Sequence, residues 1–151
     1  MNKWTLRFLN LAQSIALWSE DETTKVGCVI VCSDHQIISY GYNGLPRRLS
    51  ATPRDRHDRA SGEKYFWFEH AERNAIYAAA SSGRRTKGAT MYLTWFPCVD
   101  CTRAIIQSGI TRLIAEPPDF DHNKWGEDFR RSLAMLEEAG IVIELLTKEN
   151  P

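Results

Sequence analysis

Apolar residues near the N-terminus recur at the spacing of one helical face. The apolar positions on this face include Trp4, Phe8, Leu11 and Ile15. A repeat of three and four residues is typical of an amphipathic helix with one buried side. The pattern therefore predicts a helix over residues 3–18.

Two apolar runs and a polar segment follow this helix. Residues 26–32 (VGCVIVC) form a continuous run rich in β-branched side chains, which is typical of a buried strand. Polar residues 33–36 separate this run from a second one at 37–42, and the pair predicts an antiparallel hairpin. Residues 44–64 are polar and rich in Arg, Asp, Ser and Pro, which predicts a long loop.

Helical and strand patterns alternate through the remainder of the chain. Helices are expected over residues 69–81, 98–108 and 126–139, and strands over residues 90–94, 111–115 and 141–146. Each helical pattern ends close to a glycine, which is a common helix stop. Alternation after an initial hairpin predicts a three-layer α/β/α sandwich around a mixed, mostly parallel five-stranded sheet.

The composition is that of an ordinary globular domain. The 151 residues are 43% hydrophobic and 25% charged, which suits one domain with one core. We therefore expect a single domain over residues 1–151. The 19 Lys and Arg residues balance the 19 Asp and Glu residues, so the net charge favours neither a nucleic-acid partner nor an anionic membrane.

The N-terminal pattern carries no targeting or membrane signal. Arg7, Asn10 and Gln13 interrupt its apolar residues, unlike the apolar core of a signal peptide. No apolar run reaches the roughly 18 residues that a bilayer span requires. We expect a cytoplasmic protein, and in that compartment cysteines are more often metal-binding, catalytic or reduced than paired in disulfides.

Two cysteines stand three residues apart in the stretch FPCVDC. Cys98 and Cys101 lie at the start of a predicted helix, behind Pro97, at a position where a missing N–H costs nothing. The helix N-terminus favours the thiolate form that a metal requires. Such a pair can be a redox dithiol, a structural half-site, or part of a zinc site that also contains histidine.

A second motif, HAE at residues 70–72, begins another predicted helix. Both helices are expected to start at the same end of the sheet, so His70 can join Cys98 and Cys101 as a third zinc ligand. Glu72 is rotated by about 200° from His70 around the helix, which favours action on a zinc-bound water over ligation. His-x-Glu followed by Pro-Cys-x-x-Cys is the signature of zinc nucleobase deaminases.

The sequence resembles the cytidine deaminase superfamily and is most similar to its deoxycytidylate (dCMP) deaminase branch. The matching stretches are TKVGCVIV (24–31), GYNGLP (41–46), HAERNAI (70–76), MYLTWFPCVDC (91–101) and AIIQSGI (104–110). The resemblance implies an α/β/α fold, one catalytic Zn²⁺ per chain, and hydrolysis of dCMP to dUMP and ammonia. It also implies a homo-oligomer, with dCTP and dTTP as candidate allosteric nucleotides.

The resemblance assigns roles to individual residues of these motifs. His70, Cys98 and Cys101 match the zinc ligands, and zinc lowers the pKa of its bound water toward about 7. Glu72 matches the residue that takes a proton from this water, delivers it to ring N3 and later protonates the leaving amine. The backbone of Ala71 matches the position that contacts the pyrimidine carbonyl.

Further residues are candidates for contacts to the sugar, the base and the phosphate. Asn43 in GYNG matches the residue that holds the sugar, although Asn-Gly is also an ordinary turn signal. Trp95 precedes the cysteine motif and is a candidate wall of the base pocket. We expect the phosphate to be held by the loop at 44–64 and by residues 120–125 (FDHNKW). The candidate phosphate partners are Lys25, Arg47, Arg48 and Lys124.

Other functions fit part of the pattern. The substrate could be dCTP or a modified dCMP, because the motifs do not distinguish these nucleotides. A tRNA adenosine deaminase shares HAE and PCxxC, but GYNG, IIQSGI and the balanced charge favour a mononucleotide. A catalytically inactive, zinc-stabilised partner module would have no need of Glu72. A thioredoxin-like redox pair at Cys98 and Cys101 would contain no stoichiometric zinc.

Overall fold

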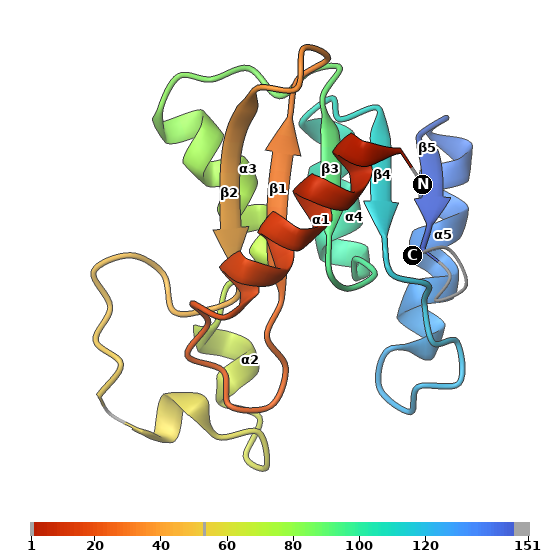
Figure 1. Ribbon diagram of the computed structural model, residues 1–151. Coiled ribbons are helices and arrows are strands. Elements are labelled where there is room, and N and C mark those ends of the chain that lie inside the picture. The colour runs from red at the N-terminus through yellow and green to blue at the C-terminus, as the bar shows by residue number, and fades with distance from the viewer. Residues whose placement is uncertain (1, 53, 147–151) are drawn as a thin grey trace.

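The computed structural model describes residues 2–52 and 54–146, and its five strands form one sheet in the order β2-β1-β3-β4-β5 (Figure 1). The strands are β1 (Gly27–Val31), β2 (Ile37–Tyr42), β3 (Thr90–Leu93), β4 (Arg112–Ala115) and β5 (Val142–Leu145). The helices are α1 (Lys3–Ala16), α2 (Lys64–Trp67), α3 (Ala71–Ser81), α4 (Val99–Gln107) and α5 (Gly126–Glu138), with a 3-10 helix, η1 (Arg54–His57). The predicted strands and long helices are confirmed, with ends that differ by one or two residues.

Strand β1 runs opposite to the other four strands. It pairs antiparallel with β2 on one side and with β3 on the other, whereas β3 and β4, and β4 and β5, are parallel. The predicted hairpin and the mixed, mostly parallel sheet are therefore confirmed. Because β2 and β3 point the same way, their carboxyl ends lie at one edge of the sheet. Gly44, just after β2, pairs there with Glu69, just before α3.

Helices cover both faces of the sheet (Figure 1). Helix α1 packs on one face against a cluster that includes Val29 and Tyr92. Helices α3, α4 and α5 pack on the other face against a cluster that includes Ile30 and Met91. Successive side chains of a strand point to opposite faces, so neighbouring residues of β1 and β3 supply both cores. This arrangement confirms the three-layer α/β/α sandwich and explains why β1 is apolar throughout.

Two glycines let helix backbones approach the sheet closely. An ideal Cβ on Gly27 would lie 1.9 Å from the backbone oxygen of Ala12 in α1. An ideal Cβ on Gly41 would lie 2.3 Å from the backbone oxygen of Ala71, the first residue of α3. Both distances are far below van der Waals contact. These glycines therefore set the depth at which α1 and the start of α3 rest on the hairpin.

The segment predicted as a loop over residues 44–64 contains more regular structure than expected. It includes η1 and leads into α2, and each of these helices has only four residues. A helical repeat cannot show in so short a stretch of sequence. Lys64, the first residue of α2, is buried and forms an ion pair with Asp21. A contact from a distant part of the chain thus stabilises this turn, and the loop prediction was incomplete.

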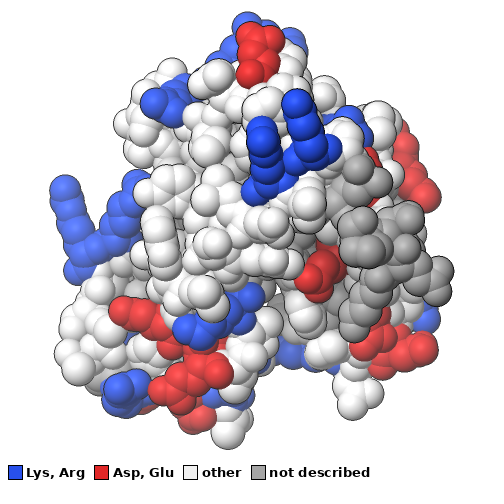
Figure 2. Space-filling model, in the orientation of Figure 1, with Lys and Arg blue, Asp and Glu red and all other residues white. Residues whose placement is uncertain are grey.

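Charged side chains are interspersed over the face of the molecule that carries α1. Figure 2 shows Lys and Arg beside Asp and Glu on this face, without a continuous strip of one sign among the described residues. The charges on this face therefore give it no electrostatic preference for a polyanion. Within the described ranges, no helix has the length and apolar character needed to cross a membrane.

The close approach at Gly27 predicts a measurable loss of stability on adding one methyl group. Gly27→Ala should lower the free energy of unfolding by about 1–3 kcal/mol, because the Cβ forces α1 away from β1. Gly44→Ala is the matched control, because its Cβ would find no heavy atom closer than 3.7 Å. Thermal denaturation of both variants measures the difference. Equal melting temperatures would contradict the packing described for α1.

Candidate active site

Three side chains that can bind a metal meet at the starts of α3 and α4. His70 is the N-cap residue of α3, Cys98 is the N-cap residue of α4, and Cys101 lies in the first turn of α4. The Nδ1 atom of His70 lies 3.5 Å from Sγ of Cys98 and 3.4 Å from Sγ of Cys101. Neither side chain makes a capping hydrogen bond to its own helix, and the two point toward one another.

The geometry of these three side chains fits a zinc ion. Tetrahedral zinc with a Zn–N bond of about 2.0 Å and Zn–S bonds of about 2.3 Å would place nitrogen and sulfur about 3.5 Å apart. The observed separations agree with this value, and all three ligand atoms lie within 4.8 Å of one another. One imidazole and two thiolates also leave a fourth position for water or substrate, as in catalytic zinc sites.

The two sulfur atoms differ strongly in acidity. The contact with Cys101 lowers the pKa of Cys98 to about 5, with a smaller contribution from His70 and against the effect of burial. The contact with Cys98, together with burial, raises the pKa of Cys101. The pair therefore readily provides one thiolate. Zinc requires both sulfurs as thiolates, so binding releases the second proton.

An arginine joins the two helix starts that carry these ligands. Arg73 in α3 donates to Glu69 through Nε at 2.6 Å, and its guanidinium lies 3.9 Å from a carboxylate oxygen of Asp100 in α4. Asp128 of α5 accepts a hydrogen bond from the backbone N–H of Val99, at the first residue of α4, at 2.8 Å. These bonds fix α4 against its neighbours and satisfy one of its free N–H groups.

A buried carboxyl group lies next to the three ligands. Glu72 is only 4% exposed, and its side chain lines a cavity together with His70 and Cys98. Burial raises the pKa of Glu72 to about 7, against the opposing effect of His70. A carboxyl group with a pKa near neutrality can both accept and donate a proton.

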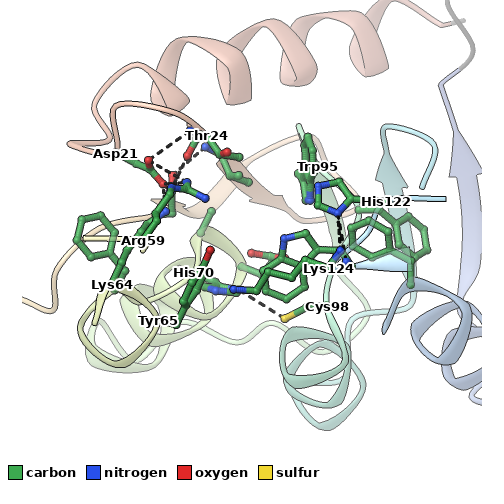
Figure 3. Close-up of a pocket in the computed structure, with 18 residues that line it drawn as sticks. Asp21, Thr24, Arg59, Lys64, Tyr65, His70, Trp95, Cys98, His122 and Lys124 are labelled. Carbon is green, nitrogen blue, oxygen red and sulfur yellow. Dashed lines mark hydrogen bonds and ion pairs between the residues drawn. The ribbon is translucent and has the colours of Figure 1, made fainter. Parts of the chain in front are cut away.

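This cavity brings together most of the candidate residues for substrate binding (Figure 3). Asn43, Ala71 and Trp95 line it, as does Lys124 from the segment at 120–125. Its apolar wall consists of Val26, Phe68, Trp95, Phe96, Trp125 and Phe129. One cavity therefore presents apolar rings, two of the zinc-type ligands (His70 and Cys98) and polar groups to the same ligand.

The side chain of Asn43 is buried and strongly hydrogen-bonded. Its Oδ1 accepts from the backbone N–H of Val26 at 2.8 Å, and its Nδ2 donates to the backbone oxygen of Thr24 at 2.8 Å and to Asp21 at 3.2 Å. Both donors are therefore used, and one lone pair of Oδ1 remains for a ligand. The asparagine of GYNG therefore holds the segment at Asp21, Thr24 and Val26 in place at the cavity wall.

The other predicted phosphate partners lie outside this cavity. The ammonium group of Lys25 donates to the backbone oxygen of Ser19 at 2.6 Å, and Lys25 does not line the cavity. Arg47 borders a separate surface groove near β2, and Arg48 lines no described cavity.

Sequence reasoning missed an ionic cluster at one side of the cavity. The buried carboxylate of Asp21 accepts from Arg59 at 2.8 Å and also pairs with Lys64. Burial opposes ionisation of Asp21, but the bonds from Lys64, Thr23 and Arg59 hold its pKa well below the usual value. These charges are separated by about forty residues in the sequence, and no local pattern links them. His122 was missed as an individual residue, although its segment was expected to cover the substrate.

The fold and the site together define a class of protein. The domain is an α/β/α sandwich, and its site combines a His-Cys-Cys cluster with an adjacent buried glutamate. This combination is typical of zinc-dependent deaminases. The family described as the cytidine and deoxycytidylate deaminase zinc-binding region matches residues 2–116. The chain belongs to this family and is a zinc-dependent deaminase.

Individual relatives cover most of the chain. An uncharacterized deaminase in the luxG 3' region of Aliivibrio fischeri is 36% identical over 148 residues, which make up 97% of this chain and 95% of the relative. The deoxycytidylate deaminase of Homo sapiens is 37% identical over an alignment of 115 residues, which covers 74% of this chain and 64% of the human protein. The crystal structure of dCMP deaminase from the cyanophage S-TIM5 in complex with dCMP and dUMP has a TM-score of 0.77 at 22% identity, covering 97% of this chain and 99% of that one. This last likeness shows the fold.

The ligand geometry predicts about one zinc ion per chain. His70→Ala, Cys98→Ala and Cys101→Ala should each lose most of the bound zinc, because two remaining ligands hold the ion too weakly. Cys32→Ala is the matched control, since Cys32 is a free cysteine outside the cluster. Metal analysis of purified proteins, with circular dichroism to verify folding, measures the effect. Full zinc content in all three variants would exclude this ligand set.

Proposed function

We propose that the protein hydrolyses dCMP to dUMP and ammonia. The observation that carries this proposal is the position of buried Glu72 beside His70, Cys98 and Cys101 in a cavity with apolar walls and cationic residues. The similarity to deoxycytidylate deaminases supports the choice of nucleotide. Pyrimidine deoxynucleotide metabolism is the setting that follows from this substrate.

Glu72 moves the protons of the reaction. When bound, zinc supplies the Lewis acidity that makes water nucleophilic at neutral pH. As water attacks C4 of cytosine, Glu72 accepts its first proton and delivers it to ring N3. Glu72 then takes the proton of the new C4 hydroxyl and gives it to the amine. The C4–N bond breaks, a C4 carbonyl forms, and ammonia leaves.

The surrounding residues orient the nucleotide. Ala71 is the first residue of α3, where backbone N–H groups lack helical partners and can donate to the pyrimidine carbonyl. The ring of Trp95 contacts the edge of Phe129 and provides a wall for the base. The free lone pair on Oδ1 of Asn43 can accept a hydrogen bond from a sugar hydroxyl.

Assembly, regulation and location belong to the same proposal. The family resemblance supports a cytoplasmic homo-oligomer with dCTP and dTTP as allosteric nucleotides. Light scattering coupled to size-exclusion chromatography, with and without each nucleotide, measures the assembly. Activity titrations with the same nucleotides measure the regulation.

Replacing the proposed proton carrier should separate chemistry from metal binding. Glu72→Gln should retain zinc and the fold but lose about 10²–10⁴-fold in kcat, because an amide cannot accept the proton. Glu138→Gln, at an exposed position on α5, is the control and should match the wild type. Ammonia release and zinc content are measured on the same samples. A Glu72→Gln variant within a few-fold of wild-type turnover would remove Glu72 from the mechanism.

A panel of cytosine compounds tests the substrate. Charge-assisted hydrogen bonds contribute about 1.5–3 kcal/mol each, so kcat/KM for dCMP should exceed that for deoxycytidine by a hundred-fold or more. Asn43→Ala should reduce kcat/KM for both, because the sugar contact is common to them. A preference for dCTP would agree with the proposed deamination but would contradict the choice of dCMP as the substrate. Activity on tRNA adenosine alone would overturn the proposal.

A further inference from the structure

The turn formed by residues 122–124 brings two polar side chains to the cavity on the opposite side from Asp21. Both His122 and Lys124 line the cavity, and Figure 3 shows His122 beside Trp95. The two rings meet edge to face, with centroids 6.5 Å apart. The cluster of His70, Cys98 and Cys101 contains no residue of this turn, and the proposed proton transfers use Glu72.

The hydrogen bonds of His122 determine which ring nitrogen faces the ligand. Nδ1 accepts from the backbone N–H of Lys124 at 3.1 Å and from that of Trp125 at 3.2 Å. An accepting Nδ1 carries no hydrogen, so the proton of the imidazole is on Nε2. The ring therefore offers an N–H donor, and the same bonds hold the backbone of Lys124 in place.

Lys124 is the uncommitted cation of the cavity lining. Its Nζ atom lies 2.7 Å from the centroid of the Tyr65 ring, and none of the ion pairs among the described residues involves it. The other two cations of the lining, Arg59 and Lys64, both pair with the buried carboxylate of Asp21. An anion that approached them would compete with that carboxylate.

We infer that His122 and Lys124 bind the 5′-phosphate of the nucleotide and so determine specificity for a phosphorylated substrate. The inference rests on the proposed function and names the residues of this site that recognise the phosphate. An ammonium group and an N–H donor from one short turn offer two hydrogen bonds to the same phosphate. A charge-assisted hydrogen bond to phosphate is stronger than an exposed cation–π contact, so the phosphate draws Lys124 away from Tyr65.

The turn borders both the candidate wall for the base and the start of α2. His122 contacts Trp95, the candidate wall for the base, and Lys124 reaches Tyr65 at the start of α2. His70 and Cys98 line the same cavity, which can therefore hold the base near Cys98 while the phosphate reaches the turn. Lys25, by contrast, is bonded to a backbone oxygen outside the cavity.

The test compares substrates with and without the phosphate in matched variants. Lys124→Gln should lower kcat/KM for dCMP by about 10- to 100-fold, the equivalent of one charge-assisted hydrogen bond, and change that for deoxycytidine by less than three-fold. His122→Ala also removes a contact of Trp95 and should lower kcat/KM for both substrates, with the larger loss for dCMP. Arg59→Gln should affect both substrates equally, since Arg59 acts through Asp21. Lys87→Gln is the neutral control, because Lys87 is exposed just before β3, at the opposite end of that strand from Trp95.

Binding of the product dUMP tests the proposed phosphate subsite without requiring turnover. Calorimetric titration should show that Lys124→Gln weakens dUMP about 10- to 100-fold and leaves deoxyuridine unchanged. Equal dUMP affinity in Lys124→Gln and wild type, or a selective loss in Lys25→Gln instead, would overturn the inference. Failure of the wild type to release ammonia from dCMP and deoxycytidine would contradict the proposed function. The dUMP titration would still test the phosphate subsite in that case.

Discussion

The site depends on two helices that start at the same edge of the sheet. His70 and Cys98 occupy the N-cap positions of α3 and α4, and both have extended backbone conformations. An N-cap side chain usually bonds to its own helix, but these two point toward each other instead. The metal site therefore requires that β2 and β3, which flank β1, end at the same edge of the sheet, because the chain reaches both helix starts from that edge. A shift of either helix would separate the imidazole from the thiolates.

A buried carboxylate organises the cavity wall opposite the turn at 122–124. Asp21 accepts hydrogen bonds from Thr23, Asn43 and Arg59 and pairs with Lys64. A buried charge is costly unless other groups compensate it, and here several parts of the chain must fold together to do so. Through this one group the segment after α1, the residue after β2 and the start of α2 become a single unit. The hydrogen bond to Asp21 helps to fix the orientation of the Asn43 side chain.

The two sides of the cavity thus differ in electrostatic character. On the Asp21 side, Arg59 and Lys64 share one carboxylate and hold the segments around it together. On the other side, Lys124 lies over the rings of Tyr65 and Trp125, and none of the ion pairs among the described residues involves it. A count of the cations around the cavity would treat these sides as equivalent, whereas an incoming anion would compete with a carboxylate only on the Asp21 side.

The sequence alone predicted the strands, the long helices, the layer arrangement and the candidate metal ligands, because each has a local signature. Periodicity identified α3 and α4, and the short motifs HAE and PCVDC placed His70, Glu72, Cys98 and Cys101 at their starts. The roles of the cations depended on tertiary structure. Lys25, Arg59 and Lys124 are all basic residues in polar stretches, and nothing in their neighbourhoods distinguishes them. A backbone oxygen engages the first, Asp21 engages the second, and the third lies over Tyr65. The role of a charged side chain depends on the partners that folding places next to it. These partners come from segments that are distant in the chain.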